Sequence, residues 1–167
     1  MPVAAHDIAV ISAQLGRPAR GVIGVGWRCP CGNPAVTVTA PRLPDGTPFP
    51  TTYYLSCPNA VTAVSRLEAH GLMVNYNARL AIEPELATAY DVAHHAYLAD
   101  RAALPGGDTV PEITGVSAGG MPTRVKCLHA LLAHALAAGT GVNPIGDEVR
   151  ALVGEFWGEP CSPEVAA

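Results

Sequence analysis

Proline and glycine divide this chain into segments and constrain its fold more than any other feature of the sequence. There are 17 glycines and 16 prolines among 167 residues, which predicts many turns and abrupt helix starts. Three prolines stand where the first residue of a helix belongs, since proline has no amide proton to leave unpaired. They predict helices over about 58–70, 84–103 and 122–138, and Gly71 and Gly139 follow the first and the last.

Three short runs rich in β-branched and aromatic residues precede these helices. They cover 22–27, 36–39 and 51–56, and turn residues separate them, so we expect three antiparallel strands. The connection over 41–50 contains an Asp-Gly turn signal and several prolines, which predicts an ordered and exposed loop.

Both ends of the chain carry a further helical pattern. Residues 7–15 place apolar side chains at helical spacing, with Asp7 as the N-cap, and residues 144–157 hold room for one more short helix. The segment 104–120 between two predicted helices is too rich in glycine for regular structure, and such a long connection is a candidate functional loop.

Composition agrees with a folded domain. Hydrophobic residues make up 49% and charged residues 14% of the chain, against about 25% charged in an average domain, which excludes disorder over the whole length. The sequence therefore predicts a single α+β domain over residues 1–167. A small antiparallel sheet of about three strands packs with four to five helices, and the tail over about 158–167 is frayed.

The charge balance and the apolar runs limit the partners. Ten basic residues against fourteen acidic ones give a net charge of −4, so no nucleic-acid partner is expected. The most apolar run, 128–138, is interrupted by two histidines and is shorter than the roughly 20 residues that a membrane span needs. The N-terminus lacks a signal-peptide pattern, and we expect a soluble, cytoplasmic protein.

Five cysteines are present, and in a reducing cytoplasm they are expected to bind metal, to react or to lie buried. The run Cys29-Pro-Cys31-Gly resembles a zinc knuckle, in which a tight turn aims two thiolates at one ion, although the usual spacing has two residues between the cysteines. Packing as small apolar side chains is the alternative. The predicted ligands for zinc, or alternatively for an iron–sulfur cluster, are Cys29, Cys31, Cys57 and Cys127.

Two histidines near Cys127 are candidates for additional ligands. In a continuous helix over 122–138, Cys127 and His129 would lie about 200° apart around the axis, and Cys127 and His134 about 10.5 Å apart along it. We therefore expect at most one of these three residues to join the other cysteines. Alternatively, both histidines are packed against the leucines of an apolar helix face.

The segment before this helix combines flexible glycines, a helix start and two cations, which is a favourable arrangement for binding an anion. It lacks the P-loop pattern, and a plain connecting loop is the alternative. The candidate anion-binding residues are Ser117, Gly119, Gly120, Thr123, Arg124 and Lys126.

Cysteine at a helix start supports a different class of function. Cys57 directly precedes Pro58, and this position favours a thiolate that could act as a nucleophile. Cys127 is a second candidate, because Arg124 and Lys126 lie close to it in sequence and could hold a phosphate or carboxylate substrate.

Several longer segments together resemble one family, the bacterial domain of unknown function numbered 501. They are RCPCGNPAV, PRLPDGTPFPTTYYL with the following Cys57-Pro58, SRLEAHGLM, GGMPTRVKCLHALLAHALA and GVNPIGDE. The resemblance extends over about residues 15–148. It implies a small cytoplasmic protein of actinobacterial type, often encoded near a division protein, enolase and an exopolyphosphatase, and it implies no particular chemistry.

Three hypotheses follow from the sequence. The first is a metal-binding domain that presents the glycine-rich loop to a protein partner or to a small anionic ligand. The second is a cysteine-thiolate enzyme that acts on an anionic substrate. The third is a metal-free interaction protein linked to cell division or housekeeping.

Overall fold

A three-stranded antiparallel sheet occupies the N-terminal third of the computed structural model, which describes residues 3–159 and 161. Its strands β1 (Val22–Arg28), β2 (Pro34–Thr39) and β3 (Tyr53–Leu55) follow one another in space as they do in sequence. The first helix, α1 (Ala5–Leu15), contacts β2. Asp7 lies inside α1 rather than capping it, and its carboxylate accepts two hydrogen bonds from Arg28 of 2.7 and 2.9 Å.

The prolines mark two of the three helix starts correctly. The helices α2 (Pro58–Ala69) and α4 (Pro84–Ala102) begin at the expected prolines and end within one residue of the expected positions. Between them lies α3 (Leu72–Ile82), which the sequence reading missed. No proline or capping side chain marks its start, because the chain turns there through Gly71 with φ of +81°.

The third predicted helix is shorter than expected. Helix α5 (Leu128–Ala138) begins six residues after Pro122. The intervening chain instead forms a tight loop, in which the amide of Arg124 donates to Gly120 O at 3.0 Å and the amide of Lys126 donates to Gly119 O at 2.7 Å. The second bond uses an amide that a helix starting at Pro122 would direct to Pro122 O.

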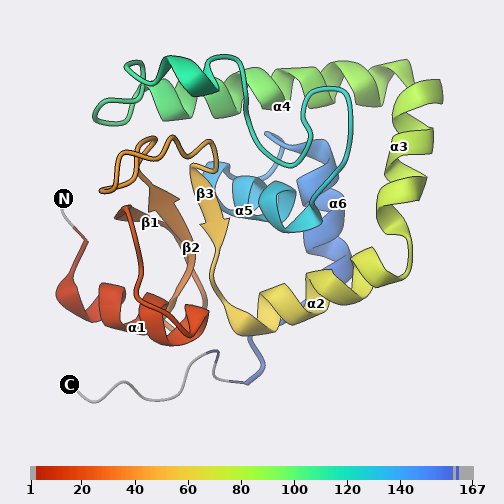
Figure 1. The fold of residues 1–167 in the computed structure, drawn as a ribbon. Coiled ribbons are helices and arrows are strands. Elements are labelled where there is room, and N and C mark those ends of the chain that lie inside the picture. The colour runs from red at the N-terminus through yellow and green to blue at the C-terminus, as the bar shows by residue number, and fades with distance from the viewer. Residues whose placement is uncertain (1–2, 160, 162–167) are drawn as a thin grey trace.

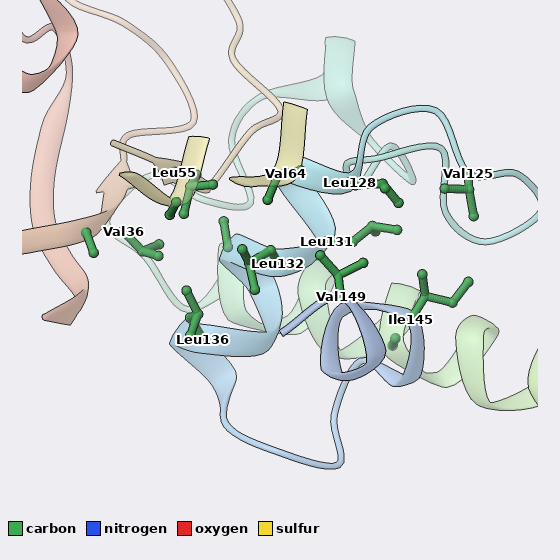
Figure 2. Packing of buried hydrophobic residues seen from close by; sticks show 14 of the residues in the cluster. Val36, Leu55, Val64, Val125, Leu128, Leu131, Leu132, Leu136, Ile145 and Val149 are labelled. Carbon is green, nitrogen blue, oxygen red and sulfur yellow. The ribbon is translucent and has the colours of Figure 1, made fainter. Parts of the chain in front are cut away.

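Helix α5 lies at the centre of the molecule. It contacts all three strands as well as α2 and α6 (Pro144–Val153), and α2, α3 and α4 surround the α5–α6 pair on three sides (Figure 1). Seven of its eleven residues are buried and none is exposed, as expected for a helix that is apolar all round. Figure 2 shows its leucines between the sheet residues Val36 and Leu55 and the α6 residues Ile145 and Val149.

Irregular chain between α4 and α5 contains only one regular element within the described residues, the 3-10 turn η1 (Pro111–Ile113). Arg101 holds this connection in place, because its buried guanidinium donates hydrogen bonds to Pro50 O, Ile113 O and Val116 O. The exposed loop over 41–50 turns at Asp45 and Gly46 as predicted, and Arg42 pairs with Pro48 across it.

The C-terminal segment returns to the sheet. After α6 ends at Gly154, the rings of Phe156 and Trp157 pack against Trp27 with centroid distances of 6.1 and 6.3 Å. Most of the segment expected to be frayed lies outside the described residues, but Cys161 is described and is buried. Along residues 3–159, no helix is both long enough and apolar enough to cross a membrane.

Candidate functional site

The turn between β1 and β2 carries the first two cysteines. The amide of Cys29 donates to Asn33 O at 2.9 Å, and the amide of Gly32 donates to Cys29 O at 2.8 Å. Gly32 has φ of +93°, a conformation that favours glycine. This closed turn keeps Cys29 buried while Cys31 stays exposed.

Cys161 completes a group of three sulfurs at this turn. Its Sγ lies 3.2 Å from Cys31 Sγ, and the sulfurs of Cys29, Cys31 and Cys161 all lie within 4.8 Å of one another. The sequence reading did not select Cys161, although it was the fifth cysteine left over from a predicted set of four. Tertiary packing of the tail against Trp27 is what returns it to the sheet.

Side-chain amides surround the sulfur of Cys161. Gln14 Nε2 and Asn33 Nδ2 each donate toward it at 3.8 Å. Burial opposes ionisation of Cys31, but hydrogen bonds from the Asn33 backbone and from its two cysteine neighbours lower the pKa of its thiol to about 7. Burial raises the pKa of Cys29 to about 11 and also raises that of Cys161. Cys31 is therefore the most readily ionised of the three thiols.

Cys57 is not one of the three cysteines whose sulfurs lie within 4.8 Å of one another. It is the N-cap of α2, is fully buried, and its amide donates to Ala35 O on β2. A charge on Cys57 would raise the pKa of both Cys29 and Cys161, which places it within electrostatic reach of them. Because its side chain is buried, the structure does not present Cys57 to a substrate as the nucleophile hypothesis requires.

Cys127 belongs to a different group. Its sulfur lies within 4.8 Å of ligand atoms of Glu68 and His129. Cys127 and His129 therefore lie together, contrary to the expectation that they face opposite sides of a helix. Cys127 is the N-cap of α5 with an extended backbone, φ −154° and ψ 109°, so the rotation of 100° per residue does not apply to it.

Glu68 on α2 joins this second group to the start of α5. Its Oε1 accepts the amide of Leu128 at 2.8 Å and lies 3.2 Å from His129 Nδ1. The other ring nitrogen of His129, Nε2, lies 3.3 Å from Val61 O and 3.2 Å from Ser65 Oγ. Sequence reasoning missed Glu68, because nothing in the pattern of α2 distinguishes it from an ordinary surface glutamate.

The thiol and the imidazole of the second group favour charge on each other. Burial disfavours the thiolate of Cys127, but hydrogen bonds from His129 and from the amide of Ala130 lower its pKa below the ordinary value. The hydrogen bond with Cys127, and further the charge of Glu68, raise the pKa of His129 against the effect of burial.

A cavity of about 410 Å³ opens next to this group. Cys127 and His129 line it together with apolar and aromatic side chains from β3 and α2, including Tyr53, Leu55 and Val61. The half-buried Cys127 is therefore accessible to a small molecule in a way that the buried Cys57 is not.

All of the predicted anion-binding residues line one second hollow of about 410 Å³, which shares Thr51 and Gly119 with the first cavity. Arg124 and Lys126 are exposed there. Ser117 is buried, and its hydroxyl oxygen lies 2.8 Å from His94 Nδ1. The expected helix start is absent from this hollow, because α5 begins only at Leu128. Thr123, Arg124 and Lys126 line the hollow together with Ser117 and the two glycines.

His134 is not near either group of sulfurs as a ligand. It is fully buried, its ring stacks on Tyr53 at 5.8 Å, and its Nδ1 lies 3.1 Å from Asn143 Nδ2. His134 is therefore packed in the core, which was the alternative to its being a metal ligand.

Fold and cysteine geometry together define the class: a small α+β protein with a sulfur cluster at a β-hairpin turn and a second Cys–His–Glu group at a central helix start. The chain belongs to the family described as Protein of unknown function (DUF501), whose model matches residues 25–151. No curated protein matches the chain. No solved structure matches it either.

Proposed function

We propose that this protein is a zinc-binding domain in which the Cys29–Cys31 turn and Cys161 hold the ion, with Cys57 as the fourth ligand. The observation that carries the proposal is the meeting of three sulfurs from opposite ends of the chain within 4.8 Å. Sulfurs around a tetrahedral zinc ion with Zn–S bonds of about 2.3 Å lie about 3.8 Å apart, so small adjustments suffice for these three. Cys57 lies outside their group and has to approach further to complete the site. Cys127, the fourth ligand expected from the sequence, is replaced in this proposal by Cys161.

The surroundings of the sulfurs support a thiolate site. Amides of Gln14 and Asn33 approach Cys161, and such donors stabilise metal-bound thiolates. A divalent cation also offsets the cost of ionising buried thiols such as Cys29. A site with four protein ligands and no open position is structural rather than catalytic, and here it ties the hairpin to the tail.

Metal content tests the proposal directly. We expect anaerobically purified protein to contain zinc and to show no visible absorption, whereas an iron–sulfur cluster would give iron, sulfide and visible bands. Cys31→Ser should lose one zinc per chain relative to the wild type. Cys127→Ser serves as the matched control, since it should keep the zinc at the turn. A wild-type protein and a Cys31→Ser variant with equal zinc content would contradict the proposal.

The hollow around Arg124 and Lys126 supports a second part of the proposal, the binding of a small anion or of an acidic partner. Two exposed cations beside a glycine-rich loop favour an anion there. Inorganic phosphate should raise the thermal midpoint of the wild type, and the double variant Arg124→Ala, Lys126→Ala should lose most of this shift. Arg17→Ala, which changes an exposed arginine elsewhere, is the control and should keep it.

A further inference from the structure

Both ring nitrogens of His129 have neighbours within hydrogen-bond distance. His129 Nε2 lies 3.3 Å from Val61 O, which only accepts, and 3.2 Å from Ser65 Oγ, which can donate or accept. With the ring proton on Nε2, the lone pair of Nδ1 faces Glu68 Oε1 at 3.2 Å, and a metal ion between these two acceptors fits this tautomer. With the proton on Nδ1 instead, the ring donates to Glu68 and Nε2 accepts from Ser65 Oγ.

We propose that Glu68, Cys127 and His129 form a second metal site, distinct from the cysteine cluster, with an open coordination position facing the cavity. The three side chains bring one sulfur, one nitrogen and one oxygen within 4.8 Å of one another. A thiolate and a carboxylate carry two negative charges, which a divalent ion balances and a single proton does not. Zinc with three protein ligands is typical of catalytic rather than structural sites.

The groups around these ligands have the arrangement that metal sites require. A metal-binding histidine usually donates its other ring N–H to a carbonyl or carboxylate, which fixes the ring, and His129 does so toward Val61 O. The ligating carboxylate is itself hydrogen-bonded, because Glu68 Oε1 accepts the amide of Leu128 at 2.8 Å.

The cavity decides which molecules could reach the open position. Its apolar and aromatic walls and its volume of about 410 Å³ suit a small molecule. Arg124 and Lys126 line the neighbouring hollow. This hollow shares the lining residues Thr51 and Gly119 with the cavity. The site therefore suits a small anionic ligand with an oxygen on the metal and its remaining charge beside the two cations.

Metal counting in matched variants separates this site from the cysteine cluster. After saturation with zinc and removal of free metal, we expect two zinc ions per wild-type chain and one in each of Cys127→Ser and Cys31→Ser. His129→Gln, which keeps a polar side chain, should match Cys127→Ser, and circular dichroism checks that every variant is folded.

Cobalt tests the open position. In cobalt-loaded Cys31→Ser, azide should change the visible spectrum, because a small anion can bind an open site. The further variant with Arg124→Ala and Lys126→Ala should bind azide several-fold more weakly. Cobalt-loaded Cys127→Ser, which keeps only the closed cluster, should not respond to azide.

Each other outcome has a definite meaning. One zinc per wild-type chain that only Cys31→Ser loses would overturn the second site and leave the proposed function intact. One zinc that only Cys127→Ser loses would do the reverse. Absence of zinc from all variants would overturn both and leave Cys127 and His129 as a thiolate–imidazolium pair, which rapid alkylation of Cys127 at pH 6 would reveal. A second zinc with no azide response would overturn the open position.

Discussion

At the scale of single residues, the buried His134 makes the stability of the protein depend on pH. Asn143 Oδ1 accepts the amide of Gly146, so the Asn143 side-chain nitrogen must donate to His134 Nδ1. The ring proton then lies on Nε2, which has no hydrogen-bond partner among the described residues. Burial lowers the pKa of His134 from 6.5 to about 4, so the folded protein holds it neutral.

This shift predicts a loss of stability in mild acid. Because the unfolded chain binds the proton more tightly, the stability linked to His134 is present above about pH 6.5 and falls as the pH is lowered toward 4. The free energy of unfolding should decrease by about 2 kcal/mol more between pH 7 and pH 5 in the wild type than in His134→Gln. Urea unfolding at both pH values measures this difference, and equal pH dependence would refute the assignment.

Gly120 is constrained by space as well as by its backbone. Its φ is +95°, and an added Cβ would lie 2.6 Å from the backbone oxygen of Arg124. Gly115 has φ of +71° with nothing within 4 Å of such an atom. Both positions therefore favour glycine, but only at Gly120 would an added Cβ also come too close to another part of the backbone.

We expect alanine to have different effects at these two positions. Gly115→Ala should cost about 1 kcal/mol of unfolding free energy for the left-handed backbone alone. Gly120→Ala should cost about 3 kcal/mol, because the loop around Arg124 and Lys126 must also shift. Chemical denaturation compares the two variants, and similar losses would contradict the close contact at Gly120.

At the scale of elements, Arg101 on α4 supplies hydrogen bonds to the long connection before α5, which has little regular structure of its own. Its guanidinium donates to carbonyls of Pro50, Ile113 and Val116, which belong to two different loops. Irregular backbone buried in this way needs such donors, because its carbonyls have no strand or helix partner. Lysine cannot reproduce the planar arrangement of donors.

Arg101→Lys should therefore loosen both loops while leaving the helices formed. We expect a loss of about 2–3 kcal/mol in unfolding free energy, since buried carbonyls lose charged donors, and faster amide exchange in residues 110–117. Arg17→Lys, at an exposed position, is the control and should change the free energy by less than about 0.5 kcal/mol. Unchanged amide exchange in Arg101→Lys would show that the loops hold by other contacts.

At the scale of the whole molecule, the two ends of the chain meet at one place. The turn between β1 and β2 and the segment after α6 are in contact through Trp27, Phe156 and Trp157 and through the sulfurs of Cys31 and Cys161. A zinc ion at the cysteines would therefore stabilise an association of distant segments, which is where a cross-link restricts the unfolded chain most.

Removal of zinc should report through the neighbouring tryptophans. Excess chelator should lower the thermal midpoint and change the tryptophan emission, because Trp27 and Trp157 become more exposed when the tail separates. The same chelator should have little further effect on the emission of Cys31→Ser, which lacks the intact site beforehand. An unchanged wild-type emission would indicate that the aromatic contacts hold the tail without metal.

Local rules determined the framework of this protein from sequence alone. Prolines at helix starts located α2 and α4, β-rich runs located the strands, and the patterns over 7–15 and 144–157 located α1 and α6 approximately. Those signals depend on backbone chemistry within a few residues, so the sequence shows them directly. The residues predicted to bind an anion line one hollow for a similar reason, because they lie within ten positions of one another in the sequence.

Tertiary structure alone decided which residues form each site. Cys161 joins Cys31 across 130 positions of the chain, and Glu68 reaches His129 from another helix. The distance between such residues depends on how the elements pack. A difference of six residues at the start of α5 also brought Cys127 and His129 together, because a capping residue does not follow the helical rotation. The sequence thus predicted a cysteine cluster, while the division of the cysteines into two separate groups depends on the tertiary structure.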